Sequence, residues 1–514
     1  MNRIIGTIFL IFTILILNAC SKAPSKEQPN VLFVVVDDWN DWIGILNSNP
    51  NVKTPNVDKL ASEGFTFTNA YCASPLCNPS RTSILTGKMP SNTGIYKNNQ
   101  WWIPALPDIV TLPKYFKDNG YHTVGAGKIF HHTAGFNDPK AWNEYYFWNK
   151  DAVTNGLDEM WHRPVSPHPQ PAPQSIITNR TKRNFDYAKL NVPDSIMPDS
   201  KTAEWVANFL KNRHDKPFFL AIGMFRPHIE WYVPKKYFDM YPLDSIRIPD
   251  YLENDLDDIP EIGRSFALDD GSDHDFIKKS GIWKELVQAY LACITFSDAQ
   301  VGKVLKALKD GPNKSNTIVV FLSDHGYHLG EKDHWHKSTL WKRALHVPLI
   351  FKLPGITNPG VECNKPVSLI DLYPTLLDLC NFSVPDRLDG KSIVPLLENP
   401  DRVWNLPVVS DFLYGNYSVI SSKYHLINYR DGENELYDIY DDPNEWTNLS
   451  QDSSYTKVIE NLMQYVPKDA LEDALEKSQF VFNPRDYSFS NKKDEKVFTG
   501  FSSEPDYSWT KTDK

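Results

Sequence analysis

The sequence predicts an α/β fold: a large, mostly parallel sheet flanked by helices, with a smaller C-terminal subdomain that contains a short antiparallel sheet. Residues 31–36 read Val-Leu-Phe-Val-Val-Val, and such a run without alternation is typical of a parallel strand buried on both faces. Strand-like and helix-like segments then alternate as far as residue 400, and short strand candidates follow. The 514 residues exceed the usual size of one hydrophobic core, so a second unit is expected.

Turn and capping residues give the boundaries of the expected elements. Thr54-Pro55 is expected to begin a helix that ends at Gly64, because proline suits the first turn and glycine follows the last. A long amphipathic helix carries apolar residues on one face from Leu286 to Leu308. In chain order, the remaining elements are expected at residues 111–119 (helix), 121–126 (extended), 200–213 (helix), 218–222, 317–322 and 348–353 (strands), and 408–413, 417–420 and 424–429 (C-terminal strands).

The N-terminus has the features of a lipoprotein signal. Arg3 precedes an apolar run, and Leu17-Asn18-Ala19-Cys20 resembles the bacterial lipobox, in which the cysteine is lipidated and becomes the mature N-terminus. An ordinary signal cut elsewhere, or an uncleaved anchor, is the alternative. The protein is therefore expected to be exported and lipid-anchored in the bacterial envelope, in the periplasm or at the cell surface.

Four regions are predicted along the chain. They are a signal peptide at 1–19, a flexible tether at 20–29, the main α/β domain at 30–400 and the C-terminal subdomain with its tail at 401–514. Residues 135–195 and 470–514 are rich in Pro, Asn and charge, so they are expected to form long loops or wrapping tails.

The net charge argues against nucleic acid as a partner. The formal charge is −10 at pH 7, and the resulting field would repel a polyanion. An anionic substrate would therefore need a local cluster of cationic side chains. Four of the six cysteines, Cys72, Cys293, Cys363 and Cys380, match no metal-ligand spacing, and whether any pair of them forms a disulfide is left open.

Acidic residues directly follow two of the predicted buried strands. Asp37-Asp38 comes after the strand at 31–36, and Asp324-His325 comes after the strand at 317–322. In open α/β sheets the ligand crevice lies at the carboxyl ends of the strands. Three carboxylates favour a hard divalent cation such as Ca²⁺ or Mg²⁺. The sequence therefore predicts a metal site at this edge of the sheet.

Basic residues follow strands at the same edge. Lys128 and His131 come after the extended segment at 121–126, His228 comes after the strand at 218–222, and Lys337 ends a His-rich run. One such residue alone is more often a surface base or a satisfied histidine. Together they would supply the local positive charge with which an acidic protein holds an anion.

Residues 77–87 carry the most specific motif. They read Cys77-Asn78-Pro79-Ser80-Arg81-Thr82-Ser83-Ile84-Leu85-Thr86-Gly87, a Cys-x-Pro-x-Arg run that closes on Leu-Thr-Gly. The plain interpretation is a buried cysteine ahead of a helix. The motif resembles the maturation site of the type I sulfatases, in the alkaline phosphatase superfamily. Segments from Asn30 to Leu449 extend the likeness and are most similar to iduronate-2-sulfatases, among them Val124-Gly125-Ala126-Gly127-Lys128, Arg226-Pro227-His228-Ile229 and Glu435-Leu436-Tyr437-Asp438.

This resemblance implies a formylglycine-dependent sulfatase with an alkaline phosphatase-like fold, acting on sulfated glycans. Cys77 would be converted to 3-oxoalanine (formylglycine) by a formylglycine-generating or an anaerobic sulfatase-maturating enzyme. One Ca²⁺ per chain would be bound by Asp37, Asp38, Asp324, His325 and the residue made from Cys77. Arg81 would stabilise the formylglycine, Lys128 and His131 would contact its hydrate and the sulfate, Lys337 would bind sulfate oxygens, and His228 would protonate the departing sugar oxygen.

The substrate itself is left open by the sequence. Gln100-Trp101-Trp102 and Tyr327-His328 are where selection of the sugar is expected, and neither segment closely matches iduronate-2-sulfatases. An iduronate-like specificity would fit oligosaccharides of ulvan or of glycosaminoglycans. Two alternatives remain, a phosphonate or phosphodiester hydrolase with the same nucleophile, and a glycan-binding lipoprotein without turnover.

Overall fold

The computed structural model describes residues 28–131, 135–146, 186–268, 273–355, 359–483 and 486–499. The predicted signal peptide, Cys20 and the tether up to residue 27 lie outside the described residues, as does 147–185 of the predicted loop region. Within the described part, no helix combines the length and the apolar character that crossing a bilayer requires.

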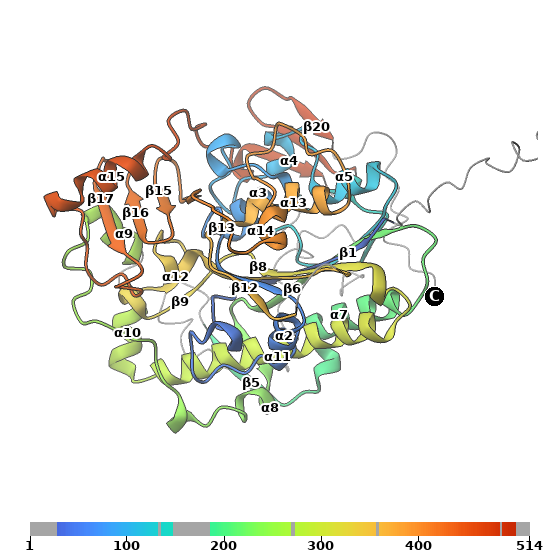
Figure 1. Ribbon diagram of the computed structural model, residues 1–514, viewed down its shortest axis with the longest axis horizontal. Coiled ribbons are helices and arrows are strands. Elements are labelled where there is room, and N and C mark those ends of the chain that lie inside the picture. The colour runs from blue at the N-terminus through green and yellow to red at the C-terminus, as the bar shows by residue number, and fades with distance from the viewer. Residues whose placement is uncertain are drawn as a thin grey trace, which may run out of the picture.

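A nine-stranded sheet forms the centre of the molecule (Figure 1), in the order β12-β2-β11-β8-β1-β6-β3-β4, with β13 also pairing with β2. Strand β1 pairs in parallel with β6 and β8, and β3 pairs in parallel with β6 and β4. Strand β11 is antiparallel to both of its neighbours. The strands are β1 (Asn30–Asp37), β2 (Phe65–Tyr71), β3 (His122–Gly127), β4 (Glu144–Tyr146), β6 (Phe218–Pro227), β8 (Thr317–Ser323), β11 (His346–Lys352), β12 (Val361–Cys363) and β13 (Val367–Ser368). The expected α/β fold with a mostly parallel sheet is confirmed.

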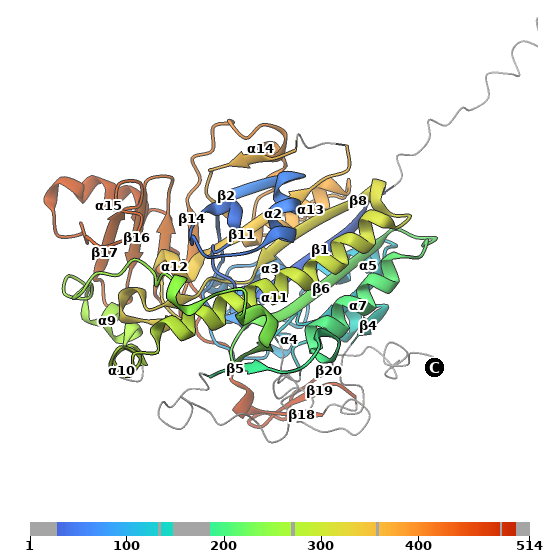
Figure 2. The same cartoon turned by 90° about the horizontal axis from the view of Figure 1, so that it is seen from below.

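Helices cover both faces of this sheet (Figures 1 and 2). Leu32, Val34 and Val36 pack against one set of helices, whereas Val31, Phe33 and Val35 pack against the other. The first set is α2 (Pro55–Ser62), α7 (Pro198–Leu210) and α11 (Trp283–Asp310), and the second includes α3 (Cys77–Thr86), α5 (Leu112–Asp118) and α13 (Leu372–Leu379). Because both sides of β1 are buried, its sequence needs no polar alternation.

A four-stranded antiparallel sheet follows in the C-terminal part, as the short strand candidates predicted. It consists of β14 (Val408–Asp411), β15 (Tyr417–Ile420), β16 (Tyr424–Asn428) and β17 (Asn434–Asp438), in that order, with α15 (Thr456–Met463) packed beside it. The position of the domain boundary near residue 400 stays a prediction.

The prediction of a long loop or wrapping tail is wrong for residues 480–499. They form a three-stranded antiparallel sheet of β18 (Phe480–Asn483), β19 (Ser488–Asn491) and β20 (Val497–Thr499). The segment is polar overall, but its aromatic residues stabilise the strands. Phe480, Phe482 and Phe489 all contact the ring of Trp101. This packing fastens the described end of the chain to the main domain.

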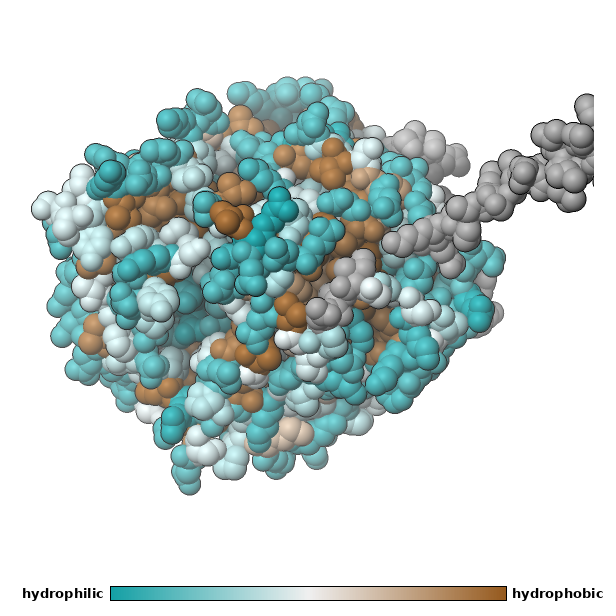
Figure 3. Space-filling model, viewed as in Figure 1, coloured by the Kyte–Doolittle hydropathy of each residue, from teal (hydrophilic) through white to brown (hydrophobic). Residues whose placement is uncertain are grey.

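Short elements complete the described structure. They are β5 (Tyr187–Leu190) paired with β7 (Trp231–Pro234), β9 (His328–Leu329) paired with β10 (Trp335–His336), and helices α4 (Trp102–Ala105), α8 (Lys235–Phe238), α9 (Glu261–Ala267), α10 (Asp273–Ser280), α12 (Lys342–Leu345) and α14 (Val394–Glu398). All five described cysteines are free, buried thiols, so the open question about disulfides among them is answered in the negative. The face in Figure 3 is mostly hydrophilic, with hydrophobic residues in scattered patches.

Candidate active site

The predicted acidic residues meet at the carboxyl ends of two neighbouring strands. Asp37 is the last residue of β1, Asp38 follows it, and Asp324-His325 follows β8. Strands β1 and β8 are parallel and paired up to Val36 and Ser323, so the residues after both strands emerge side by side. The backbone N–H of Asp38 donates to Asp324 Oδ1 at 3.2 Å and holds the two segments together.

Helix α3, which packs on the same face of the sheet as α5 and α13, brings Cys77 and Arg81 next to these acidic residues. Cys77 is the first residue of α3, and Arg81 lies one turn later on the same side of the helix. Gly87 ends the helix with a left-handed backbone, φ 67°, which suits glycine. Ser80 donates from Oγ to the backbone carbonyl of Asp324 at 2.5 Å, which fixes α3 against the end of β8.

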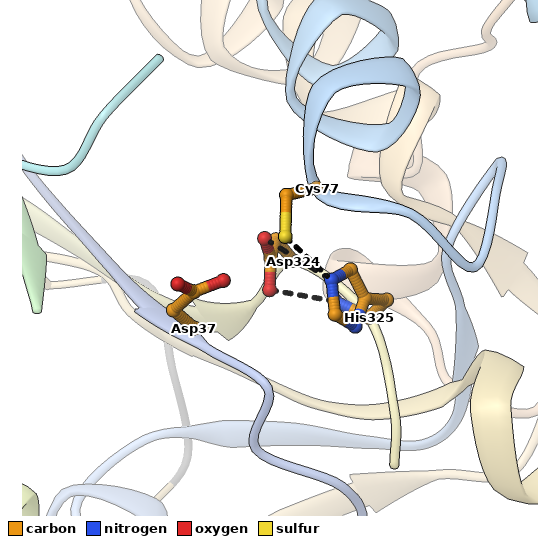
Figure 4. Close-up of side chains that lie close together, drawn as sticks. All are labelled: Asp37, Cys77, Asp324 and His325. Atoms are coloured by element: carbon orange, nitrogen blue, oxygen red, sulfur yellow. Dashed lines mark hydrogen bonds and ion pairs between the residues drawn. The ribbon is translucent and has the colours of Figure 1, made fainter. Parts of the chain in front are cut away.

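Four side chains point toward one another in this cluster (Figure 4). The donor atoms of Asp37, Cys77, Asp324 and His325 all lie within 4.8 Å of one another. His325 Nε2 lies 3.3 Å from Cys77 Sγ and 3.6 Å from Asp324 Oδ2. Cys77 is 1% exposed and the other three are fully buried. A second cluster joins Cys77 with Asp38 and His228.

The cluster fits a divalent cation. Two buried carboxylate oxygens, Asp37 Oδ1 and Asp38 Oδ2, form no hydrogen bond with any described residue. Buried polar atoms are normally satisfied, so two such atoms in the adjoining clusters around Cys77 indicate an ion-binding role. Oxygen ligands about 2.4 Å from a Ca²⁺ ion can be at most about 5 Å apart, which agrees with the observed spread of the donor atoms.

Two lysines neutralise the carboxylates. Lys128 follows β3 and forms an ion pair with Asp37 Oδ2, and Lys337 forms one with Asp38 Oδ1. Lys337 Nζ also lies 3.4 Å from Cys77 Sγ. Both lysines therefore lie at the site, as the sequence predicted, although each contacts a carboxylate and its predicted contact with sulfate stays a prediction.

Arg81 is fully enclosed between two acids. Its Nε donates to Asp324 Oδ2 at 2.8 Å, and its Nη2 lies 3.4 Å from Asp37 Oδ1. Burial by itself would raise the pKa of Asp37, but the positive charges of Lys128, His228 and Arg81 hold that pKa well below its ordinary value. Asp37 is consequently ionised at neutral pH, as a cation ligand must be.

His228 lies at the rim of the site, just after β6. Its Nδ1 lies 2.7 Å from the carbonyl oxygen of Ile229, which can only accept, so Nδ1 carries the hydrogen. The other nitrogen, Nε2, faces inward, 3.9 Å from Asp38 Oδ2. Because its side chain is 17% exposed, His228 is accessible to a group that enters from solvent.

His131 belongs to neither of the two donor clusters. The residue is 7% exposed, and its ring packs edge-on against Phe136 with the centroids 4.9 Å apart. Its contact with hydrate and sulfate stays a prediction.

The aromatic residues that were expected to select the sugar are buried in the core. Trp102 stacks on Phe130 at 5.4 Å and donates from Nε1 to the carbonyl of Phe136 at 2.7 Å. Tyr327 and His328 are fully buried. The rings of Trp102 and Tyr327 therefore pack between secondary-structure elements, whereas His328 lines a small cavity of about 50 Å³. Selection of the sugar by these segments stays a prediction.

Tyr290 is a site residue that the sequence did not reveal. It lies on α11, where its position on the apolar face indicated only packing. Its hydroxyl donates to the carbonyl of Asp38 at 2.7 Å and accepts from the N–H of Asn40 at 3.0 Å. Asp38 has φ 62°, a left-handed conformation that is unfavourable for aspartate, and these bonds hold it there.

If the cluster holds a divalent cation, a Tyr290→Phe variant is expected to bind it about tenfold more weakly, because partners that orient metal ligands are worth about 10–100-fold in affinity. The ring would still stack on Tyr327, so the packing is kept. Titration calorimetry of metal-free protein with Ca²⁺ measures this change. Tyr327→Phe is the matched control, since it removes a buried hydroxyl that bonds His336 and not Asp38. Equal losses in the two variants would refute the positioning role of Tyr290.

Two family models match the chain. The model described as Sulfatase matches residues 29–382, and the model described as N-sulphoglucosamine sulphohydrolase, C-terminal, matches residues 330–471. The first of these covers more than half of the chain.

Two similar proteins agree with the first family model, and a similar solved structure agrees with the fold. A sulfatase from Formosa agariphila is 38% identical over 476 residues, 89% of this chain and 90% of the relative. Human iduronate 2-sulfatase is 32% identical over 409 residues, 71% of each chain. The crystal structure of a phosphonate monoester hydrolase of Agrobacterium radiobacter has a TM-score of 0.69 at 22% identity, over 85% of this chain and 94% of that one. At that identity, the structural likeness shows the fold alone.

Proposed function

Because this chain belongs to the sulfatase family of sulfuric ester hydrolases, we propose that it removes sulfate from sulfated glycan fragments with a formylglycine made from Cys77. One observation carries the proposal. Cys77 lies in a buried cluster with Asp37, Asp324 and His325, although these residues come from three distant parts of the chain. A thiol that served only packing would not need three ionisable neighbours.

The proposed formylglycine explains why the nucleophile is not a plain hydroxyl. Its hydrate offers two hydroxyls on one carbon, one to displace the sugar oxygen from sulfur and one to re-form the aldehyde as sulfate leaves. Cys77 Sγ, 3.3 Å from His325 Nε2 and 3.4 Å from Lys337 Nζ, stands where those oxygens would lie. A formylglycine-generating or anaerobic sulfatase-maturating enzyme is the partner that this chemistry requires.

One Ca²⁺ is proposed for the carboxylate cluster. Asp37, Asp38, Asp324 and His325, with the modified Cys77, would hold it, and the ion would supply positive charge next to the transferring sulfate. Three carboxylates are the donor set that a hard cation prefers.

The basic residues would then hold the sulfate. Lys128 and Lys337 contact the second oxygen of each carboxylate, which leaves Asp37 Oδ1 and Asp38 Oδ2 for the cation and holds both ammonium groups beside it, where an anion would meet them. Arg81 would stay on Asp37 and Asp324 and keep the two acids in place. Fixed positive groups in a site without water stabilise the charge that develops on the sulfate oxygens.

His228 is proposed to protonate the departing sugar oxygen. A His228→Ala variant is expected to lose about 10²–10⁴-fold in kcat on a sugar sulfate, because an alkoxide leaves poorly without an acid. An aryl sulfate should lose much less, since phenolate leaves with little help. Steady-state rates on both substrates, measured on the same preparation, test this. Equal losses on the two substrates would exclude the acid role.

An iduronate-like specificity is proposed on the strength of the identity to human iduronate 2-sulfatase. Oligosaccharides of ulvan or of glycosaminoglycans are the candidate substrates. The test is a screen of defined sulfated oligosaccharides, with the released sulfate and the desulfated carbon both identified. Including a phosphodiester and a phosphonate monoester in the screen separates the sulfatase from the alternative hydrolase, and faster turnover of either phosphorus ester would overturn the proposal.

The protein is further proposed to be exported and anchored by lipid at Cys20. The lipobox-like Leu17-Asn18-Ala19-Cys20 supports this. A Cys20→Ala variant is expected to lose the acyl modification, which metabolic labelling with a radioactive fatty acid would report. Labelling that is unchanged in this variant would defeat the proposed anchor.

A further inference from the structure

A groove lies on the side of the molecule away from the active site, between α2 and α11. It has a volume of about 600 Å³ and reaches the start of β8 and the end of β11. Figure 2 shows α2 and α11 on the same face of the sheet, and the two helices are in contact. Apolar side chains contribute to its lining, namely Leu60, Leu305, Leu308 and Val319.

The remaining lining is strongly basic. The groove is lined by five lysines, Lys59, Lys306, Lys309, Lys314 and Lys352, but by only two acids, Glu63 and Asp310. Glu63 pairs with Lys352 at 2.6 Å, and Asp310 pairs with Lys306.

Three of these lysines keep an uncompensated charge. Lys59, Lys309 and Lys314 are exposed, and none forms an ion pair with a described residue. The groove is therefore positively charged, although the whole chain has a net charge of −10. The lining therefore combines exposed lysines with apolar side chains that are mostly buried beneath them, which matches a ligand whose anionic head contacts the lysines.

The chain enters the fold beside this groove. Asn316 donates from Nδ2 to the carbonyl of Gln28 at 3.1 Å, and Asn30 pairs with Thr317, which itself lines the groove. A tether from Cys20 to Pro29 can span at most about 30 Å when fully extended. A lipid at Cys20 would therefore keep this edge of the molecule close to the membrane surface.

The active site lies at the other end of the same strands. Strand β8 starts at Thr317, in the groove, and ends at Ser323, next to Asp324. Its seven residues rise about 3.3 Å each, which separates the two sites by roughly 20 Å. Contact of the groove with a membrane would consequently leave the active site facing away from it.

We propose that this groove binds anionic phospholipids of the membrane to which Cys20 is anchored, and so orients the catalytic edge outward. The proposal rests on the lipid anchor proposed above, and it adds a second contact that fixes the orientation of the domain, which an anchor on a tether does not. Juxtamembrane lysines are attracted by the negative potential of anionic lipid.

The test uses the mature chain from Ser21, without the acylated cysteine, and measures cosedimentation with vesicles. Vesicles of phosphatidylcholine mixed with phosphatidylglycerol are expected to bind the protein, and vesicles of phosphatidylcholine alone are not. The triple variant Lys59→Gln, Lys309→Gln, Lys314→Gln should bind about a hundredfold more weakly, at about fivefold for each lysine. The control Lys284→Gln, Lys457→Gln, Lys468→Gln changes the charge equally outside the groove lining and should bind like the parent.

Equal binding by the groove variant and the parent would overturn the proposal, as would equal binding to both kinds of vesicle. A sulfated polysaccharide is the competing occupant. If the parent bound heparin through these lysines but ignored the phosphatidylglycerol vesicles, the lipid assignment would be wrong. Sulfate release from a soluble substrate should be the same in all three proteins. Since vesicle binding is read without turnover, a failure of the proposed sulfatase activity would be seen separately.

Discussion

Sulfate release is expected to disappear in a Cys77→Ala variant, with a loss on the order of 10⁴-fold or more, while the fold persists. Alanine has no sulfur that could be converted to an aldehyde, so the proposed nucleophile cannot form. Cys77 is 1% exposed at the first turn of α3, and alanine continues a helix at least as well. Turnover of an aryl sulfate measures the loss of activity, and circular dichroism shows whether the fold is retained.

Cys72→Ala is the matched control for this loss. Cys72 is also buried, but its thiol contacts the carbonyl of Ala344 at 3.8 Å and belongs to neither donor cluster. That variant should keep its turnover and lose only a modest amount of stability, about 1 kcal/mol. Activity in Cys77→Ala, or inactivity of both variants, would contradict the assignment of Cys77 as the nucleophile.

Cation binding is expected to fall by more than a hundredfold in an Asp37→Asn variant. Asp37 is fully buried in the donor cluster, and the loss of a direct ligand should exceed the 10–100-fold effect of an outer partner. The substitution also leaves Lys128 and Arg81 without their shared counter-charge, which costs about 3–5 kcal/mol for a broken buried pair. Calcium titration of metal-free protein and the melting temperature with and without Ca²⁺ report the two effects separately.

Asp41→Asn separates lost stability from lost binding. Asp41 is a buried acid only a few residues further on, and it pairs with Arg343 and His346, away from the donor cluster. Its replacement breaks a buried ion pair too, but the calcium affinity should stay near that of the parent. If Asp41→Asn weakened calcium binding as much as Asp37→Asn, the cluster would not be the cation site.

The sheet could be predicted because its strands are marked by their own sequence. Strand β1 is apolar from Val31 to Val36, since both of its faces meet helices, and this property can be seen without knowing the partner strands. The convergence of Asp37-Asp38 with Asp324-His325 followed from the parallel arrangement, which places the ends of β1 and β8 together.

Features that depend on tertiary contacts could not be predicted. Tyr290 looked like any apolar position of a long helix, and only the folded chain shows its hydroxyl on the backbone of Asp38. The polar sequence of residues 480–499 indicated a tail. Their strands form because three phenylalanines pack against Trp101, which lies almost 400 residues earlier in the chain. The burial of Trp102 could not be predicted either, because the sequence around an aromatic residue does not tell whether its ring is exposed or packed in the core.

Mass spectrometry of the tryptic peptide that contains Cys77 tests the central claim most directly. In protein isolated from its own cells, the account predicts a peptide about 18 Da lighter than the unmodified one, because sulfur and two hydrogens leave and oxygen enters. The aldehyde should also react with a hydrazide reagent. An intact thiol at Cys77 in protein that still releases sulfate at full rate would contradict the account.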